Sequence, residues 1–131
     1  MGTDWAALAA MFRERVREAT GHDLDFSLES LAVLDDLLDE WLYLAQVYGS
    51  ERPHDLSELE QPLIAYVGET LRQNFGGQWV ERPTGSVLRI SHAIDLDLRP
   101  LVQATLVHQH PPSFARLASA LERELEERAW K

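Results

Sequence analysis

The stretch from Tyr66 to Trp79, YVGETLRQNFGGQW, constrains the fold more than any other part of the chain. Its apolar residues recur at helical spacing as far as Phe75, and two glycines, Gly76 and Gly77, follow. Because glycine adopts the left-handed conformation that ends a helix at little cost, a helix should stop at Phe75.

The residues after the glycines change to the pattern of extended chain. The periodicity of residues 78–82 is no longer helical, and Pro83-Thr84-Gly85 favours a turn before a second extended run over residues 86–91. We therefore expect a short antiparallel β-hairpin directly after the helix. Residues 92–96 are open to two interpretations, a third short strand or a connecting loop.

Two residues of the same helix, Gly68 and Glu69, are each expected to have a particular side chain close by. Gly68 costs about 1 kcal/mol relative to alanine in mid-helix, so its presence indicates a side chain close to the backbone, and Trp79 is the candidate. If Glu69 is buried beside Trp79, it needs a partner, and Arg72, Arg89 or the indole N–H can serve. A raised pKa there would make Glu69 a candidate general acid, although a structural hydrogen-bonding role is the more ordinary interpretation.

The length of 131 residues fits one domain, 1–131, that can bury a core without metals or disulfides. The chain has no cysteine, which excludes disulfides, thiolate metal sites and cysteine nucleophiles. It has no apolar run of signal-peptide type and none near the roughly 20 residues that span a membrane. We expect a cytoplasmic protein that does not enter a membrane.

The first half of the chain predicts two helices. Thr3 can cap a first helix that ends near Gly21, and Ser27 can cap a second over residues 28–48. The second helix has the clearest apolar stripe and is expected to be central. That stripe consists of Leu31, Leu34, Leu38, Trp41, Leu42, Ala45 and Tyr48.

The second half predicts three more helices. Ser57 with Glu60 forms a capping box, and Pro62 predicts a kink or a preliminary turn before the main helix. Asp97 can cap a fourth helix, which His110-Pro111 ends, and Ser113 can start the last one. The expected fold class is α+β and predominantly α, with about five helices and the hairpin after the third.

The net charge of −10 is concentrated in one segment. Residues 23–60 hold eleven acids and one base, Arg52, while the rest of the chain is balanced. Four acids of this segment, Asp35, Asp36, Asp39 and Glu40, are expected together on the side of the second helix opposite its apolar stripe. This charge disfavours nucleic acid and anionic membranes as partners and favours a basic protein partner or simply solubility.

Two patterns suggest metal chemistry without supporting it. Asp35-Asp36-x-x-Asp39 matches the DDxxD pattern with which isoprenoid synthases hold magnesium, but the chain has no convincing second acidic cluster and no lysine before Lys131. His108 and His110, with His92 or Asp95, could offer ligands, yet a structural role of His108 in the last turn of a helix is favoured. We therefore predict no metal and no cofactor.

The pattern Tyr66-x-Gly68-Glu69, followed after six residues by Gly76-Gly77-x-Trp79, resembles one found in small uncharacterised bacterial domains, often actinobacterial. In those domains a helix that ends in a Gly-Gly turn leads into a Trp-bearing strand. The resemblance covers Leu59 to Ile90 and implies a fold arrangement and a bacterial source, and it carries no reaction with it.

The leading functional hypothesis is a noncatalytic protein-binding or regulatory module. It would use Asp35, Asp36, Asp39 and Glu40 to engage a basic partner, as an immunity-type inhibitor of a toxin does. We predict no catalytic residues on this hypothesis.

Two alternatives remain open. In one, a small enzyme or ligand-binding domain has a pocket where Glu69, Trp79, Arg89 and His92 converge. In the other, the chain is a subunit of a homo-oligomer with an exposed apolar patch around Trp5 or Trp130.

Overall fold

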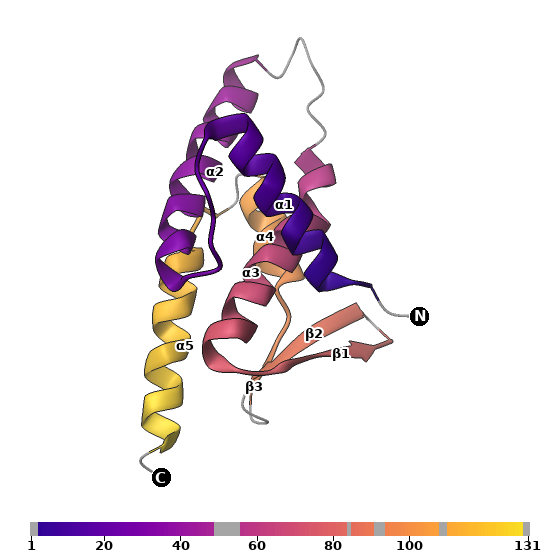
Figure 1. The fold of residues 1–131 in the computed structure, drawn as a ribbon, viewed down its shortest axis with the longest axis vertical. Helices are drawn as coiled ribbons and strands as arrows, with labels where there is room; N and C mark the ends of the chain where they lie inside the picture. The colour runs from indigo at the N-terminus through magenta and orange to yellow at the C-terminus, as the bar shows by residue number, and fades with distance from the viewer. Residues whose placement is uncertain (1–2, 49–55, 84, 91–93, 108–109, 130–131) are drawn as a thin grey trace.

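The computed structural model describes residues 3–48, 56–83, 85–90, 94–107 and 110–129, which form five α-helices and a three-stranded antiparallel sheet (Figure 1). The helices are α1 (Trp5–Thr20), α2 (Leu28–Tyr48), α3 (Glu60–Phe75), α4 (Arg99–Leu106) and α5 (Phe114–Ala129), with a 3₁₀ turn, η1 (Leu56–Leu59), before α3. The strands are β1 (Gln78–Arg82), β2 (Gly85–Ile90) and β3 (Ile94–Leu96). The expected fold class is confirmed, and β3 decides between the two interpretations of residues 92–96. Within these ranges, no helix combines the length and apolar character needed to cross a membrane.

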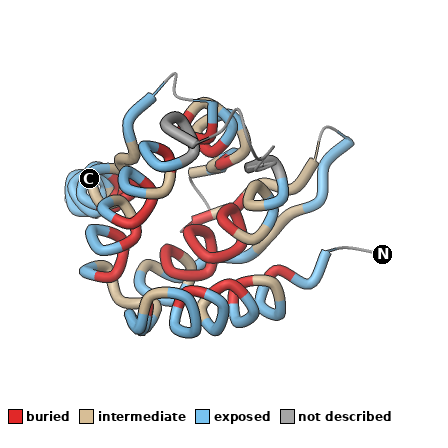
Figure 2. The backbone as a smooth tube through the Cα atoms, turned by 90° about the horizontal axis from the view of Figure 1, so that it is seen from above, coloured by how far each residue is buried: buried red, intermediate tan, exposed pale blue. Residues whose placement is uncertain are grey.

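The central element is α3, which contacts α1, α2, α4, α5 and β2. All nine residues from Leu63 to Leu71 are buried, so this helix is enclosed on every side, as the tube coloured by burial shows (Figure 2). A helix enclosed in this way belongs inside the core. The expectation that α2 would share the central position is therefore wrong, because α2 keeps one face in solvent.

Two further helices, α1 and α2, each turn one apolar side toward the core. α1 buries Trp5, Ala9, Phe12 and Val16, which recur at steps of three and four residues, and packs along α3. α2 buries one side and packs mainly against α5 (Figure 1). Among residues 28–44, the part of α2 whose burial is described, the buried residues are Ser30, Leu31, Leu34, Leu37, Leu38 and Leu42. Trp41 of the expected stripe is half-buried, and the burial of Ala45 and Tyr48 lies outside the described residues.

Side-chain or glycine caps mark some of the helix ends, whereas α3 and α4 begin after Leu59 and Leu98 with no side-chain cap, so the N-caps expected for these two helices are not the ones found. The N-cap of α1 is Asp4, whose carboxylate accepts a hydrogen bond from the Ala7 amide at 3.0 Å, so the expectation of Thr3 is wrong by one residue. Ser27 accepts from the Ser30 amide at 3.2 Å and caps α2 as expected. Gly76, with a φ of 80°, ends α3 directly after Phe75, which confirms the Gly-Gly stop.

The loop between α1 and α2 is fastened to α3 at Phe26, whose φ of 61° lies in the left-handed region. The hydroxyl of Tyr66 accepts from the Phe26 amide at 3.2 Å, and Asn74 donates to the Phe26 carbonyl at 2.8 Å. The Phe26 ring also stacks on Tyr66, with ring centroids 4.9 Å apart. These contacts offset the strain of a left-handed conformation at a residue with a bulky side chain.

The sheet register separates two sets of side chains. Trp79 pairs with Leu88, whereas Gln78 pairs with Arg89, and Arg89 in turn pairs with Asp95. Because successive side chains in a strand point to opposite faces, Trp79 and Leu88 lie on one face and Arg89 lies on the other. Leu88 is fully buried, which identifies the first face as the one turned toward α3.

Candidate functional site

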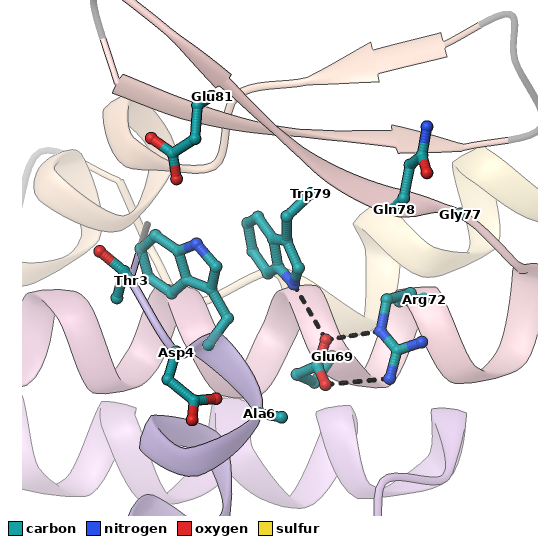
Figure 3. Close-up of a pocket in the computed structure, with 10 residues that line it drawn as sticks. Thr3, Asp4, Ala6, Glu69, Arg72, Gly77, Gln78, Trp79 and Glu81 are labelled. Atoms are coloured by element: carbon teal, nitrogen blue, oxygen red, sulfur yellow. Dashed lines mark hydrogen bonds and ion pairs between the residues drawn. The ribbon is translucent and has the colours of Figure 1, made fainter. Parts of the chain in front are cut away.

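The buried carboxylate of Glu69 is the chemical centre of the region between α1, α3 and β1 (Figure 3). Glu69 is 2 % exposed, and its side chain accepts three hydrogen bonds. Arg72 donates from Nε to Oε2 at 2.7 Å and from Nη2 to Oε1 at 3.0 Å. The Trp79 indole N–H donates to Oε2 at 2.9 Å. Two of the three partners proposed from the sequence, Arg72 and the indole, are therefore confirmed.

Trp79 reaches Glu69 because α3 has no side chain at Gly68. A Cβ atom placed on Gly68 would overlap the six-membered ring of Trp79, so the neighbour expected from the sequence is the one found. On α1, Trp5 stacks on the Trp79 indole with ring centroids 4.6 Å apart and an interplanar angle of 19°. The stacked rings thus connect α1 to β1, next to the backbone of α3 at Gly68.

The pKa of Glu69 lies below its ordinary value, which is the reverse of what a general acid at neutral pH requires. Burial acts to raise this pKa, but the hydrogen bonds from Arg72 and Trp79 and the positive charge of Arg72 together outweigh it. The carboxylate is therefore held ionised. The sequence-based condition for a general acid, a raised pKa of Glu69, is not met.

The pocket expected from Glu69, Trp79, Arg89 and His92 is present only in part, because Glu69 and Trp79 are in contact and Arg89 is not with them. Arg89 lies on the opposite face of the sheet from Trp79, where it pairs with Asp95 at 2.8 Å. Arg82 also pairs with Asp95 on this outer face. His92 lies outside the described residues. Arg89 is therefore removed from the expected pocket, because strand alternation carries it to the opposite face, whereas Glu69 and Trp79 do come together and the expectation for His92 is not tested.

A surface pocket of about 450 Å³ opens beside this pair, and we call it the indole pocket. It is lined by Thr3, Asp4, Trp5, Ala6, Glu69, Arg72, Gly77, Gln78, Trp79 and Glu81. Two of its acids, Asp4 and Glu81, are exposed, while Glu69 is neutralised by Arg72. The indole nitrogen of Trp5 is buried and has no hydrogen-bond partner within the described part of the chain.

The four acids expected to act together on α2 do not share one environment. Asp35 is only partly exposed, and its two carboxylate oxygens accept from the amides of Phe114 at 2.8 Å and Ala115 at 3.0 Å. It therefore caps α5 from α2, a structural role in place of the partner-binding role predicted. Burial raises the pKa of Asp35, against the lowering effect of these two amide bonds.

Asp36, Asp39 and Glu40 are exposed, as predicted. None of them forms an ion pair with any residue that the structure describes. The ion pairs of the described chain lie elsewhere: within α1, between α1 and its following loop, on α3, on the outer face of the sheet and on α5. Within the part of the chain that the structure describes, the three carboxylates on α2 thus have no base paired with them.

The described residues contain no group of three or more histidine and acidic side chains arranged to hold a metal ion. Asp35 of the DDxxD pattern is occupied by the α5 amides, and Asp95 is occupied by two arginines. His92 and His108 lie outside the described residues, so the histidine pattern is not placed.

No family model, curated protein or solved structure matches the chain. The resemblance of residues 59–90 to small bacterial domains therefore stays a prediction, although the helix, the Gly-Gly turn and the Trp-bearing strand are all present.

The sequence reading missed three residues of the indole pocket: Asp4, Trp5 and Glu81. The sequence offers Trp5 for the apolar stripe of the first helix and for an exposed patch, and the structure buries it at 9 % exposure. Its stacking on Trp79 joins segments whose proximity no spacing in the chain indicates. Asp4 could have been considered, since aspartate caps helices as well as threonine does. Glu81 could have been placed from strand alternation, which puts it on the same face as Trp79.

Proposed function

We propose that the chain is a noncatalytic protein-binding module that engages a basic partner through one face of α2. The observation that carries this proposal is the set of three exposed carboxylates, Asp36, Asp39 and Glu40, with no ion pair among the described residues. Like charges three and four residues apart destabilise a helix. The presence of these three carboxylates on α2 therefore supports a role for them in binding another molecule.

Apolar side chains continue the same face. Tyr43 is 65 % exposed and Leu44 is 42 % exposed. Residues four apart on a helix are neighbours, so Tyr43 follows Asp39 and Leu44 follows Glu40. We call these five residues, Asp36, Asp39, Glu40, Tyr43 and Leu44, the α2 face. An exposed tyrosine and leucine beside carboxylates can supply the apolar centre and the charged rim of an interface.

The charge pattern supports a basic partner and a fast, salt-dependent association. Opposite charge steers two proteins together and discriminates against wrong partners. An immunity-type inhibitor that covers the basic active site of a toxin is the concrete form that we favour. The low pKa and complete hydrogen bonding of Glu69 support a noncatalytic role for the one buried carboxylate of α3.

The test compares two variants with the same change in net charge. Asp36→Asn/Asp39→Asn/Glu40→Gln removes the charge of the α2 face, and Glu122→Gln/Glu126→Gln/Glu127→Gln removes three exposed charges from α5. Tagged wild-type and variant proteins are incubated with a lysate of the native cells, and retained proteins are identified and quantified by mass spectrometry. Binding is repeated at about 0.1 M and about 1 M salt, between which the Debye length falls from about 10 Å to about 3 Å.

The proposal expects a basic protein that the wild type and the α5 variant retain, that the α2 variant loses, and that high salt releases. Its affinity for purified wild type should then exceed that for the α2 variant by at least about tenfold, which corresponds to about 1.4 kcal/mol. Equal retention by all three proteins, or retention of the same partner at high salt, would contradict the proposal.

A further inference from the structure

The outer face of the sheet is turned away from α3 and has apolar side chains between basic ones. Strand alternation and register place there the side chains that we call the outer sheet face, namely Gln78, Val80, Arg82, Val87, Arg89 and Asp95. Val80 pairs with Val87, and neither packs against the core, unlike Trp79 on the other face. Figure 1 shows α1 and α3 together on one side of the sheet. Because a sheet normally buries its apolar side chains against a packed layer, the outer sheet face lacks, within the described chain, the layer that α3 gives the inner one.

The outer sheet face carries more base than acid. The carboxylate of Asp95 accepts hydrogen bonds from Nη2 of Arg82 and from Nε and Nη2 of Arg89, the latter two at 2.8 and 3.3 Å. One carboxylate balances the charge of only one guanidinium, and each guanidinium has five N–H donors, so positive charge and unused donors remain. The side chains of Arg82 and Arg89 are 43 % and 35 % exposed, which leaves them open to a carboxylate from another molecule.

The α2 face has the complementary composition. It presents three carboxylates without an ion pair among the described residues, followed along the helix by the exposed side chains of Tyr43 and Leu44. The carboxylates suit the two arginines of the sheet, and the two apolar side chains of α2 suit Val80 and Val87. The sheet and the C-terminal half of α2 lie at opposite ends of the molecule (Figure 1), so one copy cannot bring its own two faces together.

We propose that the outer sheet face of one copy binds the α2 face of a second copy. A helix laid on the open side of a sheet supplies the missing layer, and arginine–carboxylate pairs fix its position. Because the two faces differ, the contact is heterologous, and association continues beyond a dimer. The net charge of −10 repels the copies from one another, so the association is weak and needs concentrated protein. This inference rests on the proposed use of the α2 face, for which the basic partner and the second copy would compete.

Sedimentation velocity tests the contact at protein concentrations up to about 1 mM in about 0.1 M salt. Two variants each remove one face: the α2 variant, Asp36→Asn/Asp39→Asn/Glu40→Gln, and a sheet variant, Arg82→Gln/Arg89→Gln. Wild type should form species larger than a dimer, and each variant alone should associate at least about tenfold more weakly. A mixture of the two variants should form a dimer of one copy of each and nothing larger, because each variant supplies the face that the other lacks.

Two control variants separate this contact from the effect of total charge. Arg15→Gln/Arg123→Gln, on exposed residues of α1 and α5, loses the same charge as the sheet variant, and the α5 variant loses the same charge as the α2 variant. Both controls should associate at least as strongly as half of the wild-type constant, whereas repulsion between whole molecules alone would make the α2 variant associate more strongly than wild type. Circular dichroism checks that every variant is folded, and either face variant alone tests the contact.

A wild type that stays monomeric to about 1 mM, a mixture of folded variants that forms no dimer, or a face variant that associates no more weakly than its control would overturn the inference. So would an acidic protein from the native lysate that a monomeric wild type retains and the sheet variant loses, since it would assign the outer sheet face to another protein. The sheet variant keeps the α2 face and should still retain the basic partner. Failure of the proposed function is seen separately, when the α2 variant also retains that partner.

Discussion

Glu69 is buried and charged at once because three hydrogen bonds replace the water that it loses on folding. Its pKa lies below the ordinary value, so the folded protein holds a proton there less readily than the unfolded chain does. The stabilising contribution is therefore present above the unfolded pKa of about 4.3 and is lost as the pH falls through the lower folded pKa.

We predict that Glu69→Gln lowers the free energy of unfolding by about 1–2 kcal/mol at pH 7, because the amide keeps the Trp79 bond and loses the charged pair with Arg72. The deficit relative to wild type should shrink as the pH falls below about 4. Urea unfolding at a series of pH values measures it, with Glu126→Gln as a control for loss of an exposed charge. A deficit that stays constant down to pH 2 would show that ionisation of Glu69 does not contribute.

Gly68 gives the second prediction at the scale of one residue. Gly68→Ala gains about 1 kcal/mol of helix propensity, but the new methyl group meets the Trp79 ring, and overpacking of this kind costs about 1–3 kcal/mol. We expect a net destabilisation of about 1 kcal/mol in urea unfolding. In the background of Trp79→Phe, whose ring is smaller, the same change should become neutral or stabilising. A stabilised Gly68→Ala single variant would contradict the close contact.

At the scale of elements, α5 depends on α2 for its start. Both oxygens of Asp35 bond to the first amides of α5, which otherwise have no partner within their own helix. We predict that Asp35→Ala costs about 1–2 kcal/mol. Asp35→Asn should cost less, since it keeps one acceptor and removes a carboxylate whose pKa burial raises. Hydrogen exchange should show the loss at the Phe114 and Ala115 amides first. Unchanged protection of these two amides in Asp35→Ala would contradict the cap.

Features of the elements that depend on nearby residues are predicted from the sequence, whereas contacts between distant segments are not. Local chemistry predicts the Gly76 stop, the Ser27 cap and the approach of Trp79 to Gly68, because each depends on residues near one another in the chain. The Asp35 contact with α5 joins residues far apart in sequence, and a helical wheel places Asp35 with its exposed neighbours. The expected central position of α3 is confirmed, and its burial extends even to Glu69 and Thr70, whereas the same expectation for α2 fails because a helix with one polar face lies at the edge of the core.

The same limit applies to the candidate sites of the whole molecule. The sequence located the negative charge on α2 and the pairing of Glu69 with Trp79, both of which follow from residue type and helical or strand period. It could not place Trp5 against Trp79, or turn Arg89 away from them, before the strand register and the packing of α1 were known. Tertiary packing thus decided which charged residues are available to a ligand.

The whole-molecule charge distribution leads to a last prediction, which separates binding from folding. The α2 variant, Asp36→Asn/Asp39→Asn/Glu40→Gln, relieves like-charge pairs three and four residues apart, each worth about 0.2–0.5 kcal/mol. Its free energy of unfolding should therefore exceed that of wild type by about 0.5–1 kcal/mol, and this gain should diminish in high salt. The α5 variant has the same net charge, but it removes two attractive pairs, of Arg123 with Glu126 and Glu127, together with two repulsive ones, Glu122–Glu126 and Glu124–Glu127, so these contributions offset one another. That variant should be unchanged in stability. Urea unfolding at low and high salt compares the two, so any effect of total charge cancels. If the α2 variant is no more stable than the α5 variant, the acids of α2 do not destabilise the fold. The stability cost that supports a binding role for these acids would then be absent.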